Sequence, residues 1–134
     1  PDITEAGQDR AFAPIATVAR PTSLGTGQIY AIRFSTDGDK IFFLYSNTDR
    51  IYEHALTVNW DITTIVATAT TNYYYGGYES NAYDFCFSPD GLHMYVLGTG
   101  SDVLRHWTLT SPFSLSTLNL FINIILAQNG MQVQ

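Results

Sequence analysis

The sequence predicts an all-β fold of two tandem four-stranded antiparallel meanders. Three observations support this prediction: an internal repeat with a period of 53 residues, strand-like alternation of apolar and polar residues within each copy, and no long stretch with helical periodicity. With 134 residues, the chain is long enough for one domain with a buried core.

The repeat is clearest in two segments, IRFSTDGDKIFFL and FCFSPDGLHMYVL, which begin at Ile32 and Phe85. Phe34 aligns with Phe87, an offset of 87 − 34 = 53 residues, and both are expected to be buried at equivalent places. The alignment continues without a gap. Further matched pairs are Tyr30 with Tyr83, Asp37 with Asp90, Gly38 with Gly91, Leu44 with Leu97, Asp49 with Asp102, and Trp60 with Phe113.

Each copy contains four predicted strands in order. IYAIRFS alternates and ends at the STDGD turn, and the second copy has SPDGL at that place. Gly38 and Gly91 supply the positive φ that such turns require, and Pro89 presets φ earlier in its turn. KIFFLYS and HMYVLG are β-branched and aromatic runs, RIYEHALT and VLRHWTLT alternate again, and TTIVATAT completes the first unit. The units span about residues 30–72 and 83–127.

A surplus strand is expected near the N-terminus. The 53-residue offset aligns Phe12 to Val18 with the fourth strand of the first unit, and aligns that strand in turn with Leu118 to Ile124. In all three segments every second residue is mostly apolar, as expected for strands that bury the same face. The chain then has three strands of this type for two meanders. We therefore expect a flexible polar arm at residues 1–11, an extra strand at 12–19, and a single all-β domain over 12–134.

The segment DFCFSPDGLHMYVLGTGSDVLRHWTLTSPFSLSTLN resembles a β-propeller-like repeat of bacterial surface proteins and phage structural proteins. Blades of that family carry an F-S-x-D-G turn, an M-Y-V strand and an L-S-T segment. The first copy is similar with more drift, including NWDITT from Asn59. The resemblance implies blade-like sheets that serve as binding or structural surfaces, and it implies no catalytic residues.

Two four-stranded units are too few for a closed propeller, which usually has about four to eight blades. Either the two sheets pack as a sandwich or several chains complete one ring. In both arrangements the exposed strand edges must be paired or covered. The C-terminal LNLFINIILAQ, which is uncharged and β-prone, is expected to be buried against a partner.

Composition excludes several classes of partner. Six basic and twelve acidic residues give a net charge of −6, which argues against nucleic acids and anionic membranes. The longest apolar run, residues 118–127, is too short to span a bilayer. A single cysteine excludes an internal disulfide. The chain begins at Pro1 without a methionine, so we expect that an initiator or leader was removed.

The candidate chemical groups favour a non-enzymatic protein. The histidines, His54, His93 and His106, fall at unrelated repeat positions without metal-ligand spacing. Cys86 has no accompanying nucleophile signature. The aspartates beside Gly38 and Gly91 are explained by tight turns rather than by calcium. We therefore predict no catalytic residues, no metal and no cofactor.

The stretch NYYYGGY, residues 72–78, is the most distinctive feature of the chain. Its counterpart one repeat earlier has Arg20 and Pro21 where Tyr73 and Tyr74 stand, so the repeat itself does not require aromatic residues there. Three interpretations remain open: packing on the core, contact between subunits, and stacking against sugar rings.

These observations predict a structural subunit that self-assembles through β-strand and tyrosine-rich contacts into a filament, tail or capsid component, outside the cell or in a virion. The expected partners are copies of the same chain, and the polar arm would carry the N-terminal strand to a neighbour. The rival is a carbohydrate-binding module completed by oligomerisation. The predicted interface residues are Phe12, Ile15, Val18, Tyr73, Tyr74, Tyr75, Tyr78, Leu120, Ile122 and Ile124.

Overall fold

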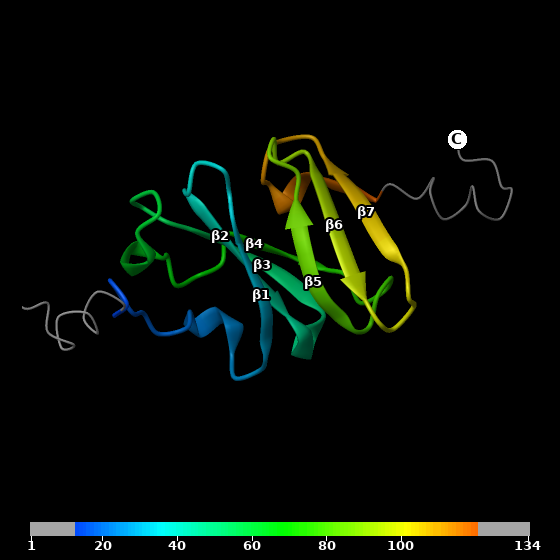
Figure 1. Ribbon diagram of the computed structural model, residues 1–134, viewed down its shortest axis with the longest axis horizontal. Coiled ribbons are helices and arrows are strands. Elements are labelled where there is room, and N and C mark those ends of the chain that lie inside the picture. Colours follow the sequence, from blue (N-terminus) through cyan, green and yellow to red (C-terminus); the bar gives the residue numbers. More distant parts are fainter. Residues whose placement is uncertain (1–12, 121–134) are drawn as a thin grey trace, which may run out of the picture.

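The computed structural model describes residues 13–120, and they form two four-stranded antiparallel sheets (Figure 1). Sheet 1 and sheet 2 each follow the order of the chain, so each is a meander. The prediction of an all-β fold with two such units is confirmed. Sheet 1 consists of β1 (Ile29–Phe34), β2 (Lys40–Tyr45), β3 (Arg50–Ala55) and β4 (Thr71–Tyr74); sheet 2 consists of β5 (Ala82–Phe87), β6 (His93–Gly98), β7 (Leu104–Leu109) and β8 (Leu118–Leu120).

The described helices are four 3-10 turns of three residues each: η1 (Thr22–Leu24), η2 (Ser46–Thr48), η3 (Ile62–Thr64) and η4 (Leu115–Thr117). η3 and η4 lie at equivalent repeat positions, after β3 and β7. In η3 the Asp61 side chain accepts a hydrogen bond from the N–H of Thr63 and caps the turn.

The backbone reproduces the repeat at its most constrained residues. Positive φ angles occur at Gly38 and Gly91 (75° and 72°), at Asp49 and Asp102 (52° and 55°), and at Trp60 and Phe113 (66° and 54°). The predicted need for glycine in the two Asp-Gly turns is thereby confirmed. The same conformation at a bulky aromatic residue is rare. Its occurrence at both equivalent sites shows that each unit folds in the same way after its third strand.

The fourth strand of the first unit differs from the prediction. TTIVATAT was expected to form it, but this stretch contains η3 and one isolated bridge, between Leu56 and Ile65, and the paired strand begins only at Thr71. His54 explains part of the departure, because its Nδ1 lies 2.8 Å from the carbonyl oxygen of Val66 and holds the chain in an irregular path. In the second unit β8 pairs with β7 directly at the equivalent place.

The extra N-terminal strand predicted at residues 12–19 is not paired within the chain over its described part, and its addition to a neighbouring copy stays a prediction. Residues 13–19 have no strand pairing. Pro14 lacks an N–H donor, and residues 18–21 lie beside η3 rather than beside a strand edge, since both segments line one hollow. Phe12 and the polar arm at 1–11 fall outside the described residues, as do residues 121–127 of the second unit.

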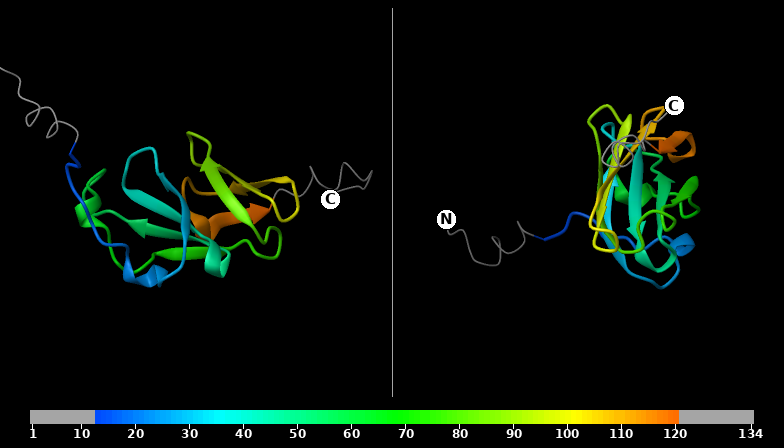
Figure 2. Two further views of the ribbon diagram at one scale, coloured as in Figure 1. Left: turned by 60° about the horizontal axis from the view of Figure 1, so that its bottom comes forward. Right: turned by 90° about the vertical axis from the view of Figure 1, so that its right-hand side faces the viewer.

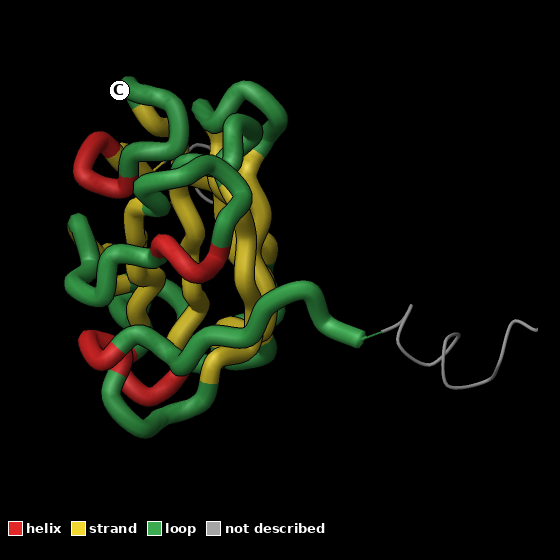
Figure 3. The backbone as a smooth tube through the Cα atoms, turned by 90° about the vertical axis from the view of Figure 1, so that its left-hand side faces the viewer, coloured by secondary structure: helices red, strands yellow, loops and turns green. Residues whose placement is uncertain are grey.

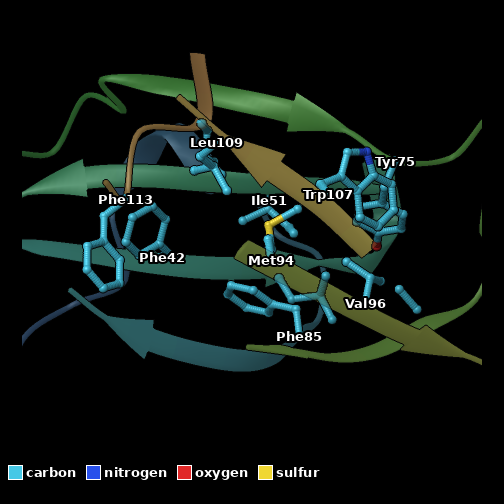
Figure 4. Close-up of a cluster of buried hydrophobic side chains, with 12 residues drawn as sticks. Phe42, Ile51, Tyr75, Phe85, Met94, Val96, Trp107, Leu109 and Phe113 are labelled. Carbon is cyan, nitrogen blue, oxygen red and sulfur yellow. The ribbon is translucent and has the colours of Figure 1, made fainter. Parts of the chain in front are cut away.

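The main core lies between the two sheets (Figure 4). Sheet 1 contributes Phe42, Leu44 and Ile51, whereas sheet 2 contributes residues from all three of its long strands and from the loop that follows. These sheet 2 residues are Phe85, Met94, Val96, Trp107, Leu109, Phe113 and Leu115. Phe34 and Phe87, expected to be equivalent and buried, are equivalent but only half-buried, each beside the aromatic residue at positive φ.

Sheet 1 is partly covered on its second face as well. Ile41 and Phe43 alternate with Phe42 and Leu44, so they point away from sheet 2 and pack with Leu24 and Leu56 in a smaller cluster. Figure 3 looks onto the side of the molecule where the N-terminal segment and the short helices surround the strands. The order of layers is therefore N-terminal segment, sheet 1, sheet 2.

The first strands of the two sheets, β1 and β5, lie side by side (Figure 2). Tyr30 and Tyr83, which are repeat equivalents, have ring centroids 5.1 Å apart. Arg33 forms an ion pair with Asp84. Equivalent strands in neighbouring sheets thus meet along one edge of the molecule, while the two sheets do not close into a ring.

Candidate functional site

The tyrosine stretch is placed partly inside the molecule. Tyr75 is buried in the main core, and Tyr73, on β4, is half-buried against it. The indole N–H of Trp107 donates a 2.9 Å hydrogen bond to the hydroxyl of Tyr73, and the two rings meet edge to face. For these two residues the core-packing interpretation describes their position: they bridge sheet 1 and sheet 2.

Burial has an electrostatic consequence for both tyrosines. Desolvation raises the pKa of Tyr73, although the hydrogen bond from Trp107 opposes that shift. Desolvation, with smaller contributions from Asp49 and Glu79, raises the pKa of Tyr75 as well. Both hydroxyls therefore stay protonated at neutral pH, and neither is suited to act as a base.

Tyr74 and Tyr78 remain at the surface. The guanidinium of Arg50 lies 5.2 Å from the centroid of the Tyr74 ring, and the Tyr78 ring meets Trp107 edge to face. Gly76 and Gly77 follow β4 in a turn rather than forming a loose segment around the tyrosines. Each surface ring already has a partner within the chain, which leaves one face or edge for an outside contact.

A charged pair completes the contact between the sheets. Nζ of Lys40 lies 3.2 Å from Oε2 of Glu53, which is almost fully buried. Glu53 also accepts a 2.9 Å hydrogen bond from the N–H of Leu115, and Lys40 donates a 2.9 Å bond to the carbonyl oxygen of Phe113. Two charges of sheet 1 thus bind the backbone of the η4 turn, and both are satisfied.

The outer face of sheet 2 carries apolar side chains that lack cover among the described residues. Leu97 and Leu104 are 53% and 55% exposed. Together with Asp84, Phe85, Cys86 and Tyr95 they line a shallow hollow of about 190 Å³. Cys86 is exposed here, on the side opposite to Phe85 and Phe87, as the strand alternation predicts.

Two histidines meet on the same face. Nδ1 of His93 and Nε2 of His106 lie 2.9 Å apart, and the His106 ring stacks on that of Tyr95 at 4.6 Å between centroids. Desolvation, with the charge of His93 as a second cause, lowers the pKa of His106. Burial thus favours the neutral form of the His106 imidazole. The hydrogen-bonded partnership of these two residues was missed by the sequence analysis.

Sheet 1 has a corresponding open area on its far side. A hollow of about 270 Å³ lies between the N-terminal segment and the strands, and its walls are almost entirely apolar. Ile32 is about half exposed there. The lining residues are Val18, Ala19, Arg20, Pro21, Ile29, Ile32, Phe34, Ile41, Phe43, Ile62 and Ile65.

The remaining predicted interface residues are placed as follows. Ile15 and Val18 are exposed on the N-terminal segment. Leu120 is the last residue of β8. Ile122 and Ile124 lie outside the described residues. The sequence analysis did not name Leu97 and Leu104 as interface residues. They were detectable, because the second copy of the repeat has apolar residues on both faces of its strands.

Within residues 13–120, no three His, Cys, Asp or Glu side chains form a group that could hold a metal ion. Buried His54 is held by Ser23 and Val66. Buried Glu79 accepts hydrogen bonds from Ser101 Oγ and from the N–H groups of Asn81 and Gly100, so it fixes the loop between β6 and β7.

The described part of the chain contains no helix that is long and apolar enough to cross a membrane. Comparison of the whole chain with protein-family models and with curated proteins gives no match.

Proposed function

We propose that this protein is a non-enzymatic structural subunit that associates with further copies of itself through its sheets. One observation carries the proposal. Leu97 and Leu104 are more than half exposed, whereas their repeat equivalents, Leu44 and Ile51, are fully buried beneath sheet 2. The same position in the same fold is thus core in one unit and surface in the other. Exposed apolar patches of this kind are typical of association surfaces.

The setting proposed for the assembly is extracellular or within a virion, as a filament, tail or capsid component. The support comes from composition: charged residues make up only 13% of the chain, about half the usual share of a soluble domain. A surface of Thr, Ser, Asn and Tyr is suited to close packing between subunits, because few charges need to be desolvated.

Carbohydrate binding is the alternative, and the tyrosine positions support it less. Sugar stacking needs free aromatic faces, but Tyr75 is buried and Tyr73 is hydrogen-bonded to Trp107. The ring of Tyr74 already carries Arg50 near its face. Only part of the stretch is available to a glycan.

Sedimentation velocity over a wide concentration range tests the proposed function. Self-association predicts a mass that rises with protein concentration at neutral pH, with no added ligand. A chain that stays monomeric up to about 1 mM, where even weak association is detected, contradicts the proposal. A monomer that binds members of a glycan array would favour the carbohydrate-binding alternative.

A further inference from the structure

The contact between sheet 1 and sheet 2 provides a template for a second contact of the same kind. Sheet 2 covers the face of sheet 1 that carries Phe42, Leu44 and Ile51. The repeat equivalents of these residues are Tyr95, Leu97 and Leu104, and all three lie on the outer face of sheet 2. The outer face of sheet 2 therefore repeats, position for position, a face that is known to accept a sheet.

The far face of sheet 1 carries the repeat equivalents of the residues with which sheet 2 covers sheet 1. Sheet 2 covers sheet 1 with Phe85, Met94, Val96 and Leu109. Their equivalents, Ile32, Ile41, Phe43 and Leu56, all belong to the far side of sheet 1. Ile41, Phe43 and Leu56 are already buried with Leu24, and Ile32 is the member of this set that stays open, at 48% exposed against 2% for Phe85. The outer face of sheet 2 thus corresponds to the face of sheet 1 that is covered. The far face of sheet 1 corresponds to the face of sheet 2 that covers it.

We propose that the chain assembles head to tail, with the outer face of sheet 2 in one copy packed against the far face of sheet 1 in the next copy. This inference rests on the proposed function and specifies its interface. The contact is heterologous, because the two copies use different surfaces, so it repeats into a ring or an open filament.

The polar groups at the centre of the proposed contact occupy the same places as those between sheet 1 and sheet 2. His93 and His106 stand where Lys40 and Glu53 stand in sheet 1, and Lys40 and Glu53 bind the backbone around η4. The equivalent backbone in the next copy surrounds η3, where Asp61 replaces the uncharged Ser114. By the repeat, the backbone groups that the imidazole pair would meet are the carbonyl oxygen of Trp60 and the N–H of Ile62, the equivalents of the groups bound by Lys40 and Glu53.

The contact between the aromatic rings of Tyr30 and Tyr83 can also be repeated between copies. Tyr30 and Tyr83 pack against each other within the chain, and each remains about half exposed. In the proposed assembly Tyr83 of one copy would contact Tyr30 of the next in the same way, because the two residues are repeat equivalents. The ion pair between Arg33 and Asp84 is not reproduced, since Cys86 and Ala31 occupy those places.

Two variants block one surface each. Leu97→Glu combined with Leu104→Glu places carboxylates on the outer face of sheet 2, and Ile32→Glu places one on the far face of sheet 1. All three positions are about half exposed, so the monomer is expected to fold, which far-UV circular dichroism checks. Thr68→Glu, at an exposed position between η3 and β4, is the matched control for added negative charge.

Sedimentation velocity at equal concentration then distinguishes the models. We expect the wild type and Thr68→Glu to assemble, and each face variant alone to associate at least a hundredfold more weakly. An equimolar mixture of the two face variants is expected to form dimers and nothing larger, because each variant retains the surface that the other has lost.

Other outcomes overturn the inference in different ways. Undiminished assembly of either face variant shows that the copies associate through other surfaces, which leaves the proposed function intact but removes this interface. A mixture that stays monomeric excludes head-to-tail geometry. A wild type that stays monomeric throughout contradicts the inference and the proposed function together.

Discussion

Nζ of Lys40 lies 3.2 Å from the buried Oε2 of Glu53, and the pair connects β2 and β3 at the surface that sheet 2 covers. A buried charge is costly unless it is paired and hydrogen-bonded. Glu53 meets that requirement through Lys40 and the N–H of Leu115. The pair therefore fixes where the η4 turn docks on sheet 1, in addition to any stability that it provides.

Replacing Glu53 by alanine is expected to lower the free energy of unfolding by about 3 kcal/mol, because the Lys40 ammonium and the Leu115 N–H lose their buried partner. Glu53→Gln keeps an acceptor for the N–H and should cost about 1 kcal/mol. Urea unfolding followed by tryptophan fluorescence measures both. Equal effects of the two substitutions would show that the charge, rather than the acceptor, is what matters.

Gly38 and Gly91 offer a matched pair of substitutions. Both have φ near 75°, and a Cβ at either position would overlap the ring of Trp60 or of Phe113, respectively. Phe113 is buried, but Trp60 is 58% exposed and can move aside. Gly91→Ala should therefore destabilise by about 3 kcal/mol and Gly38→Ala by about 1 to 2 kcal/mol. Equal losses in thermal unfolding would mean that backbone strain dominates at both sites.

The sequence was sufficient to predict the two meanders, because the 53-residue repeat aligns turns and strands that obey local rules. Gly38 and Gly91 occupy the predicted turns, and Leu44 and Leu97 lie at equivalent strand positions. The local rules failed at the fourth strand of the first unit. There the path from Ile65 to Thr71 depends on the side chain of His54, which acts across strands.

The candidate site was harder to predict for a related reason. Alternation assigns residues to two faces of a strand but does not say which face is covered. Leu44 and Leu97 look alike in sequence, yet one lies in the core and the other at the surface. Only the packing of sheet 2 on sheet 1 separates them. The pairing of His93 with His106 likewise depends on the register of β6 and β7.

Glu79 should make the stability of the fold sensitive to acid. Burial alone would raise its pKa, but hydrogen bonds from Ser101, Asn81 and Gly100 outweigh that effect and hold the pKa below the usual 4.5. The unfolded chain binds more protons between these two values. The stabilisation is therefore complete above pH 4.5 and is lost as the pH falls through the folded pKa.

The measurement is the urea midpoint from pH 7 to pH 3 for the wild type and Glu79→Gln. The variant should be less stable at pH 7 and should lose less stability on acidification. Parallel pH profiles for the two proteins would show that other carboxyl groups account for the acid sensitivity.

Trp60 should report assembly directly. It is 58% exposed, whereas its equivalent Phe113, which faces the contact between the sheets, is 9% exposed. If the next copy covers the far face of sheet 1, the emission of Trp60 should shift to shorter wavelength as the protein concentration rises. Trp107 is already buried and should not change. The Trp60→Phe variant is the control, and a concentration-dependent shift that persists in it would contradict the assignment.

Residues 18–21 should add a strand to the neighbouring copy. By the repeat they correspond to β4, which lies against η4 and pairs with β3 of sheet 1. Residues 18–21 lie beside η3 in the corresponding way. In a head-to-tail assembly they would reach the edge of β7 in the preceding copy. Among the described residues, β8 pairs with that edge at Trp107–Leu109, which lies beyond the part of β7 that the repeat assigns to residues 18–21.

Deleting residues 1–20 should therefore weaken assembly at least tenfold while the monomer stays folded, because Pro21 and Leu24 keep their buried positions over sheet 1. Deleting residues 1–12 alone, which leaves 18–21 in place, should have little effect on assembly. Sedimentation velocity compares the two truncations, and hydrogen exchange at Leu104 and Arg105 gives a second readout. Protection of these amides should appear on assembly of the shorter truncation and be absent from the longer one. If the longer truncation assembles with wild-type affinity, the faces of the sheets hold the copies together without strand addition.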